Sequence, residues 1–211
     1  MPTKTVFAMA ITALGLTAAS FPNPPADEAP VKGRETVVLA GGCFWGVEAV
    51  FEHLKGVSDV VSGYAGGNKA TAHYDIVSTG RTGHAESVKV TYDPSQISFG
   101  QLLKVYFSVA HDPTELNRQG PDSGSQYRSS IFYTTPEQKR LAEAYISELD
   151  QAKVYPKPIV TKVTPLDKFY PAEEHHQKFI DRNPTYPYVV YNDLPKLRNL
   201  KEQFPDLVKS R

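Results

Sequence analysis

Residues 36–67 read TVVLAGGCFWGVEAVFEHLKGVSDVVSGYAGG and carry three secondary-structure signals in succession. The β-branched run 36–40 predicts a buried strand that ends at a Gly-Gly turn. In residues 43–55 apolar side chains recur three and four positions apart, which indicates an amphipathic helix closed by Gly56. Residues 57–64 predict a second strand. This succession decides the fold, since it commits the chain to a sheet with a helix packed on it.

The remaining signals continue the alternation of strands and helices. Strands are predicted at residues 86–92, 128–133 and 158–164, helices at 98–107, 135–150 and 172–180, and a long polar loop at 111–127. We therefore predict an α+β fold, a two-layer α/β sandwich in which helices pack on a ferredoxin-like mixed sheet.

Composition excludes several classes of protein. The chain has 211 residues with 23 basic and 23 acidic side chains, so its formal net charge is zero. A neutral chain lacks the basic face that nucleic-acid binding requires, and we expect no nucleic-acid partner. The single Cys excludes an intrachain disulfide framework, a multi-cysteine zinc site and an iron–sulfur cluster. Counting alone favours a structural role for it, because a free Cys usually behaves as a small buried hydrophobe.

The N-terminus has the pattern of an export signal. A short basic start is followed by an uncharged apolar run from Val6 to Leu16 and then by small residues where a peptidase would cut. We predict a signal peptide at residues 1–19, with an uncleaved anchor or a buried first helix as alternatives. The apolar run is shorter than the roughly 20 residues of a membrane span. We therefore expect export to the bacterial periplasm or secretion, with no membrane span left after cleavage.

The rest of the chain divides into a linker and one folded domain. Residues 20–35 are Pro-rich, have little to bury and predict a flexible linker. Residues 36–211 form the domain, and we expect it to be a monomer. Its last segment, 193–211, is Lys-rich with leucines at near-helical spacing, which predicts a short helix docked on the surface.

Cys43 is placed for chemistry. It follows a strand and a Gly-Gly turn and stands at the first position of the predicted helix, where free N–H groups and the helix dipole favour an anion. We therefore expect the pKa of its thiol to fall and its thiolate to act as a nucleophile. Phe44 and Trp45 would wall a small apolar pocket beside the sulfur. The alternative is that Phe44 packs in the core and Trp45 is an ordinary helix residue.

Glu86 is a carboxylate on a buried strand face. It shares that face with His84, Val88 and Val90, and the valines identify the face as the one directed to the core. Burial would raise the pKa of Glu86 and keep the side chain protonated near neutral pH, as a general acid requires. The alternatives are a strand-end Glu that reaches solvent, or one that pairs with Arg128.

Residues 117–128 form a loop that is dense in hydrogen-bonding side chains, which is typical of loops that build a site. Asp122 and Tyr127 are its candidates for holding a polar substrate atom, and a solvated surface loop is the alternative. Neighbouring His175 and His176 would project about 100° apart on a helix. Because that is not the i, i+4 geometry of a helical zinc site, we predict no metal.

Several collinear segments carry a family resemblance. They are Gly42-Cys43-Phe44-Trp45-Gly46, residues 62–67, 83–86, 92–94, 111–114 and 118–129, and Tyr170-Pro171-Ala172-Glu173-Glu174-His175-His176-Gln177. Together they resemble the peptide methionine sulfoxide reductase family of the A type, and the resemblance extends from residue 36 to residue 207. It makes methionine sulfoxide, in its S epimer, the expected substrate, either free or within oxidised proteins.

The resemblance also implies roles for individual residues. Cys43 corresponds to the catalytic nucleophile of the family, and Phe44 and Trp45 correspond to its pocket for the S-methyl group of the substrate. Glu86 corresponds to the carboxylic acid that protonates the sulfoxide oxygen.

Three further residues correspond to groups around that oxygen. Tyr74 and Tyr127 match tyrosines that hydrogen-bond it, and Asp122 matches an acid that organises the site. With the methyl group, the oxygen and the attacking sulfur all fixed, such a site accepts one epimer of the chiral sulfoxide.

This chain differs from many members of the family in how its catalytic cysteine would be reduced again after each turnover. Attack by Cys43 leaves a sulfenic acid, which further cysteines near the C-terminus resolve in many relatives. Residues 186–211 of this chain contain no Cys. The resemblance therefore implies no prosthetic cofactor and an external reductant, which is a thioredoxin-like or glutaredoxin-like protein or a small thiol.

Two other functions remain open on the sequence. A thiol hydrolase would pair Cys43 with His84, His111 or His176, and no spacing selects one of the three. A secreted binding module would hold oxidised methionine with its aromatic residues and polar loop but would not turn it over.

Overall fold

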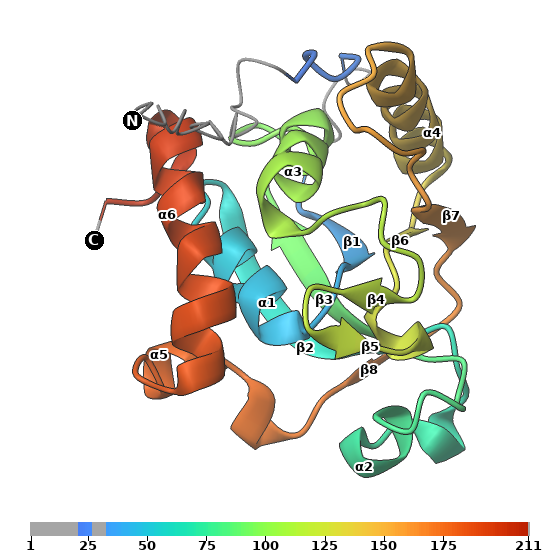
Figure 1. Cartoon of the computed structure of the whole chain (residues 1–211). Helices are drawn as coiled ribbons and strands as arrows, with labels where there is room; N and C mark the ends of the chain where they lie inside the picture. Colours follow the sequence, from blue (N-terminus) through green and yellow to red (C-terminus); the bar gives the residue numbers. More distant parts are fainter. Residues whose placement is uncertain (1–20, 27–32, 211) are drawn as a thin grey trace, which may run out of the picture.

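The computed structural model of the chain describes residues 21–26 and 33–210 and contains a six-stranded sheet with helices packed on it (Figure 1). The strand order is β7-β6-β1-β3-β2-β8. β6 and β7 pair in parallel and the other neighbours pair antiparallel, so the predicted mixed sheet is confirmed. The strands are β1 (Glu35–Ala40), β2 (Val57–Ala65), β3 (Ala85–Tyr92), β6 (Ser130–Tyr133), β7 (Lys162–Pro165) and β8 (Phe169–Pro171).

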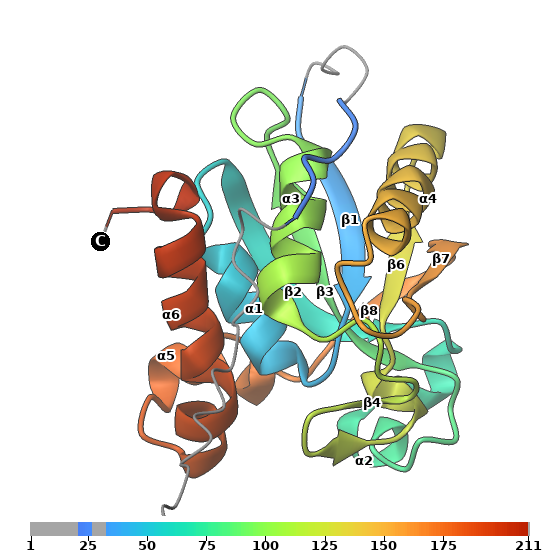
Figure 2. The same cartoon turned by 45° about the horizontal axis from the view of Figure 1, so that its top comes forward.

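Helices α1, α3 and α4 lie over one face of the sheet, and α6 lies beside α1 (Figures 1 and 2). The predicted helix starts are confirmed at the two caps. The Ser98 side chain accepts from the Gln101 backbone and the Gln101 side chain accepts from the Ser98 backbone, while Thr135 caps α4 ahead of Pro136. The helices are α1 (Phe44–Glu52), α2 (Tyr74–Val77), α3 (Phe99–Val105), α4 (Pro136–Gln151), α5 (Phe179–Arg182) and α6 (Leu194–Gln203).

The main hydrophobic core fills the space between the sheet and these helices. In the antiparallel register Val37 of β1 faces Val90 of β3, and Leu39 faces Val88. All four are fully buried and pack with apolar residues of α1, α3 and α4. The opposite face of the sheet carries a smaller buried cluster, made of Val38, Ala40, Ala65, Ala85 and Phe132. The central strands are therefore buried on both faces, as the continuous β-branched run predicts.

Two predicted elements differ from the structure. Residues 172–180 do not form one helix: a 3₁₀ turn at Glu174–His176 is followed by the short α5, because Lys178 adopts the left-handed conformation (φ 51°) that interrupts a helix. The strand expected at 158–164 begins only at Lys162. Phe169–Pro171 forms the strand β8, which pairs with β2. The sequence did not predict β8, because three residues, two aromatic and one proline, are too few to show the alternation of a strand.

Part of the predicted flexible linker is packed on the domain, which corrects that interpretation. Phe21 is 4% exposed and its ring meets Tyr155 edge-on at 5.9 Å between centroids. The Tyr145 hydroxyl donates to the carbonyl oxygen of Pro22 at 3.0 Å, and Lys104 Nζ donates to Asn23 Oδ1 at 2.9 Å. The sequence gives no signal for this docking, because a single aromatic residue supplies the burial. The predicted signal peptide, residues 1–19, lies outside the described residues.

The C-terminal segment docks as predicted. Leu197 and Leu200 of α6 are buried, and the end of the chain pairs with the end of α1 through a bridge between Leu54 and Val208. Across residues 21–26 and 33–210, no helix combines the length and apolar character that crossing a membrane requires.

Candidate active site

Cys43 lies where β1 ends and α1 begins. It is the N-cap of α1, and Gly42 before it has φ 94°, a conformation that favours glycine. A Cβ at Gly42 would also lie only 2.6 Å from Cγ of Gln119, at the end of β4 (Arg118–Gln119) and ahead of β5 (Asp122–Ser123). The Gly-Gly turn therefore brings the polar loop against the start of α1, and Cys43 is a free thiol, 8% exposed, at that junction.

The pKa of the Cys43 thiol is raised, not lowered as the helix N-terminus alone predicts. Burial is the largest cause, and the carboxyl groups of Glu86 and Asp193 add to it. The Trp45 backbone N–H and the Lys196 ammonium act in the opposite direction. The helix N-terminus therefore favours the anion as expected, but desolvation outweighs it, and the resting sulfur is a thiol.

Glu86 lies on the core face of β3 and is 2% exposed. Its Oε2 accepts a hydrogen bond from the Phe44 backbone N–H at 3.2 Å, which ties the carboxyl to the first turn of α1 beside Cys43. The pKa of Glu86 is raised to about 8, mainly by burial and also by nearby Asp122, although the hydrogen bond from Phe44 lowers it. Arg128 donates instead to backbone carbonyls of residues 83, 84 and 125. The expected burial is confirmed, and the carboxyl carries its proton at neutral pH.

Aromatic side chains surround the first turn of α1. Phe44 is 1% exposed and packs against Tyr64 and His176, so it backs the site from the core side. Trp45 stacks on Phe179 with ring centroids 3.7 Å apart and planes 6° apart. Its Nε1 donates to Nδ1 of His176 at 3.2 Å. Trp45 is therefore held from two sides, which fixes its ring in the first turn of α1, two residues after Cys43.

Tyr74 and Tyr127 lie far apart in the sequence, but both are near Glu86 and Cys43 in the structure. Tyr74 begins α2, and Tyr127 ends a 3₁₀ turn after β5. Gln126 Nε2 donates to the Ser78 carbonyl at 3.0 Å and Ser125 Oγ donates to the Gly80 carbonyl at 2.8 Å, so the turn that carries Tyr127 is joined to the segment that follows α2. Burial is the largest cause of the raised pKa of both tyrosines, and Glu86 and Cys43 add to it; the pKa of Tyr74 reaches about 12. Both side chains therefore lie near the carboxyl and the thiol, and both hydroxyls keep their protons at neutral pH.

Asp122 is half-buried behind these groups. The Tyr188 hydroxyl donates to its Oδ2, and burial raises its pKa although this hydrogen bond and Lys196 lower it. The predicted site residues therefore converge: the structure brings together Cys43, Phe44, Trp45, Tyr74, Glu86, Asp122 and Tyr127.

The C-terminal third of the chain supplies neighbours that the sequence argument missed. They are Tyr188, Asp193 and Lys196, and their signal is absent from the sequence because they reach the site only through the docking of α6 on α1. Glu173 was also missed as a site-building residue. It accepts hydrogen bonds from the Tyr64 hydroxyl at 2.8 Å and from the Tyr74 backbone at 2.9 Å, so it positions α2.

The hydrolase alternative needs a histidine whose ring is available to Cys43. His84 bonds the Asn68 carbonyl, and His111 bonds the Tyr106 carbonyl and the Ser129 hydroxyl. His176 lies within the site, where its Nδ1 accepts a hydrogen bond from Trp45 Nε1. Burial lowers the pKa of His111 to about 3, which makes it a poor base. Within residues 21–26 and 33–210, no group of three His, Cys, Asp or Glu side chains is arranged to hold a metal ion.

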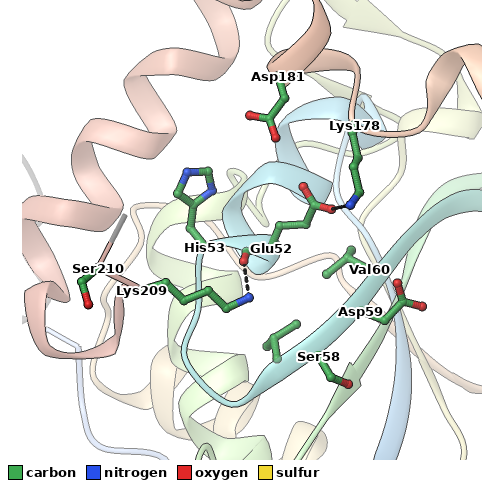
Figure 3. A pocket seen from close by; sticks show the side chains of 10 residues that line it. Glu52, His53, Ser58, Asp59, Val60, Lys178, Asp181, Lys209 and Ser210 are labelled. Carbon is green, nitrogen blue, oxygen red and sulfur yellow. Dashed lines mark hydrogen bonds and ion pairs between the residues drawn. The ribbon is translucent and has the colours of Figure 1, made fainter.

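A separate hollow of about 330 Å³ lies at the other end of α1 (Figure 3). Its charged groups satisfy one another: Lys178 Nζ lies 3.9 Å from Glu52 Oε1, and Lys209 Nζ donates to the Glu52 carbonyl at 2.7 Å. None of the predicted site residues lines it, so we assign it no part in the chemistry.

The fold and the site together define a class: an α+β protein in which a buried cysteine at a helix N-terminus lies near a buried carboxyl group and two tyrosines. Comparison with known proteins names the family. The model of the family described as "Peptide methionine sulfoxide reductase" matches residues 35–207. The chain is 62% identical to peptide methionine sulfoxide reductase MsrA 2 of Mesorhizobium japonicum, covering 88% of this chain and 95% of that protein. It is 54% identical to MsrA 2 of Synechocystis sp., covering 90% and 91%.

Solved structures agree. The reduced form of Mxr1 from Saccharomyces cerevisiae matches with a TM-score of 0.67 and 32% identity, covering 76% of this chain and 91% of that one. Methionine sulfoxide reductase A of Corynebacterium diphtheriae matches with a TM-score of 0.65 and 35% identity, covering 79% and 85%. The chain belongs to the peptide methionine sulfoxide reductase family and is an oxidoreductase that reduces methionine sulfoxide. Its lone cysteine agrees with a single-cysteine type.

Proposed function

We propose that this enzyme reduces the S epimer of methionine sulfoxide, free and in oxidised proteins, with Cys43 as nucleophile and Glu86 as proton donor. The observation that carries the proposal is the buried Glu86 carboxyl, which is bonded to the Phe44 N–H one residue from the thiol. A sulfoxide sulfur is electrophilic, but its oxygen leaves the substrate only after it is protonated. A carboxyl with a pKa of about 8 carries that proton at neutral pH.

In the first step the sulfoxide oxygen is transferred from the substrate sulfur to the sulfur of Cys43. The thiolate of Cys43 attacks the sulfoxide sulfur while Glu86 gives its proton to the sulfoxide oxygen. This attack forms a transient bond between Cys43 Sγ and the substrate sulfur. The protonated oxygen then passes to Cys43 Sγ: the sulfur–oxygen bond of the substrate and the transient sulfur–sulfur bond break, a bond between Cys43 Sγ and the oxygen forms, and the electron pair stays on the methionine sulfur. Methionine leaves reduced by two electrons, and Cys43 becomes a sulfenic acid. The proton that left the thiol restores the Glu86 carboxyl. Both groups are protonated at rest, so the thiolate forms only as the substrate accepts the first proton.

The other site residues select the substrate. The hydroxyls of Tyr74 and Tyr127 hold the oxygen beside Glu86, and Trp45, backed by Phe44, contacts the S-methyl group. Asp122 holds Tyr188 and raises the pKa of Glu86. Three fixed substituents around a chiral sulfur allow one epimer to react.

Recycling requires an external thiol, because the chain has one Cys. A first thiol attacks the sulfenic acid sulfur, water leaves and a mixed disulfide forms. A second thiol then displaces Cys43 and leaves with the first as a disulfide. A thioredoxin-like or glutaredoxin-like protein, or a small thiol, supplies both electrons, and the chemistry needs no prosthetic cofactor.

A single-turnover assay tests the function. Reduced protein is mixed, without added thiol, with each epimer of a peptide that contains methionine sulfoxide. We expect about one methionine per chain from the S epimer and none from the R epimer, and repeated turnover after a dithiol is added. Binding of the sulfoxide peptide without product would indicate a binding module, and cleavage of an ester substrate would indicate a hydrolase.

We also propose that residues 1–19 direct export and that the mature enzyme works as a monomer in the periplasm or outside the cell. The basic start and the short apolar run support export. Mass spectrometry of the N-terminus after expression in a secreting bacterial host tests it. A mature chain that begins near residue 20 is expected, and an intact Met1 would contradict it.

A further inference from the structure

An ion pair from the C-terminal segment lies over the first turn of α1. Lys196 Nζ is 3.5 Å from Asp193 Oδ1, and the Asp193 side chain is fully buried. Both groups occupy the space above Gly46, which is one helical turn beyond Cys43. A Cβ at Gly46 would collide with Asp193 Oδ1 and lie 2.8 Å from Lys196 Nζ. The missing side chain at this position therefore lets the pair approach the N-terminus of α1.

Stability alone gives no reason for this pair. Within the described residues, Asp193 Oδ2 is buried without a hydrogen-bond partner. Removing a carboxylate from water is costly, and a buried ion pair returns little net stability. The pair also lies among acidic groups, since Asp122 raises the pKa of Asp193. Its position next to the reactive thiol is the feature that distinguishes it.

The charged and titratable groups facing Cys43 come from every element packed around it. They are Glu86 on β3, Tyr74 on α2, Tyr127 after β5, Tyr188 and Asp193 before α6, and Lys196 on α6. Lys196 is the cation of this set. Carboxyl groups oppose a charge on the sulfur, and Lys196 and the Trp45 N–H favour it.

We propose that Lys196 is a positioning residue that stabilises the anionic sulfur of Cys43, and that Asp193 fixes Lys196 in place and moderates its effect. The inference rests on the reductase function proposed above. Lys196 acts twice in the cycle: when the thiolate forms and attacks the sulfoxide, and when a second thiol breaks the mixed disulfide and Cys43 leaves as a thiolate. A better-stabilised thiolate is a better leaving group in that exchange.

The rate of alkylation of Cys43 by neutral iodoacetamide tests the proposal between pH 7 and pH 9. Only the thiolate reacts, and the single Cys makes the signal unambiguous. We expect Lys196→Met to slow the reaction about tenfold at each pH, which corresponds to about one unit of pKa. Asp193→Asn should accelerate it several-fold, because the amide oxygen can still accept a hydrogen bond from Lys196 while the charge that opposes the thiolate is gone. Lys201→Met, an exposed lysine on the same helix, serves as the matched control and should leave the rate unchanged.

The opposite signs of the two substitutions separate this role from simple disruption of the fold. Lys196→Arg should restore most of the rate, and the thermal unfolding of each variant shows that it is folded. Equal rates in Lys196→Met and Lys201→Met, or a slower rate in Asp193→Asn, would overturn the proposal. Alkylation uses neither sulfoxide nor reductant, so its outcome is independent of whether the single-turnover assay supports the reductase function.

Discussion

At the scale of single residues, the proposed chemistry depends on two groups, Glu86 and Cys43, that keep their protons because they are buried. Glu86 and Cys43 are both buried, and desolvation raises the pKa of each. The carboxyl therefore keeps its proton at neutral pH, which the proposed role as proton donor requires. The thiol also keeps its proton, so in the proposed mechanism its reactivity is coupled to the arrival of the sulfoxide oxygen. A thiol kept neutral until then is also protected from other oxidants.

Substitution of the acid tests its role directly. Glu86→Gln keeps the shape and the hydrogen bond to Phe44 but carries no transferable proton. We expect the rate of methionine formation to fall at least about 100-fold with KM little changed. Glu48→Gln is the matched control: Glu48 lies on α1, is 1% exposed and also has a pKa raised to about 8. An equal loss in both variants, or an unchanged rate in Glu86→Gln, would remove Glu86 from the mechanism.

The same carboxyls predict how stability depends on pH. A folded-state pKa near 8, against 4.5 for the unfolded chain, means that the folded protein binds the proton more tightly. The resulting stabilisation is fully present below pH 4.5 and is lost as pH rises through 8. We expect the free energy of unfolding to decrease over this interval, and to decrease less in Glu86→Gln and in Glu48→Gln. Chemical denaturation at several pH values measures it, and parallel curves for all three proteins would contradict it.

Residue-scale prediction from the sequence succeeded where the signal was local. Cys43 follows a strand and a Gly-Gly turn, and Glu86 shares a face with two valines, so local sequence is enough to place both. The pKa of Cys43 was predicted in the wrong direction. The local helix terminus is visible in the sequence, whereas the burial and the carboxyls that outweigh it come from other elements.

At the scale of elements, α1 organises the site because its first turn meets four separate segments. β3 contributes the Glu86 bond, the β4–β5 segment packs on Gly42, α5 provides the Phe179 stack, and α6 covers Gly46. Elements with a strong period were predicted well. The helix predicted at residues 172–180 was wrong because Lys178 adopts the left-handed conformation and interrupts it, and no Gly or Pro in the sequence marks this break.

The contact between α1 and α6 predicts an unusual effect at Gly46. Ala is normally favoured over Gly in a helix interior, by about 1 kcal/mol. Here Gly46→Ala should instead destabilise the protein by about 1–3 kcal/mol, because the new methyl group collides with Asp193. Denaturant unfolding of Gly46→Ala in the native and Asp193→Ala backgrounds measures this. The loss should be smaller in the second background, and an equal loss in both would show that Asp193 is not the obstacle.

At the scale of the whole molecule, segments near both termini pack on the central sheet-and-helix domain. The C-terminal segment completes the site, and residues 21–26 pack on α3 and α4, helices that carry none of the site residues. The sheet and its covering helices were predictable from alternation and periodicity. The docking of the N-terminal segment was not, because it depends on one Phe in a Pro-rich stretch that is typical of a linker.

The N-terminal contact predicts a change in stability without a change in activity. Phe21→Ala should lower the free energy of unfolding by about 2 kcal/mol, the contribution of burying one aromatic side chain, and leave kcat unchanged. Leu116→Ala, at a position that is 62% exposed, is the control and should have little effect. Equal stability of Phe21→Ala and the native protein would mean that this segment does not dock in solution.

The central claim is that Cys43 takes the sulfoxide oxygen with the help of Glu86. The most direct measurement is a single turnover with the S epimer in the absence of thiol, with the sulfenic acid trapped by a dicarbonyl reagent and located by peptide mass spectrometry. The account predicts about one trapped group per chain, located on Cys43, formed in step with methionine and formed far more slowly in Glu86→Gln. Methionine formed without a modified Cys43, or formed by Cys43→Ser, would contradict it.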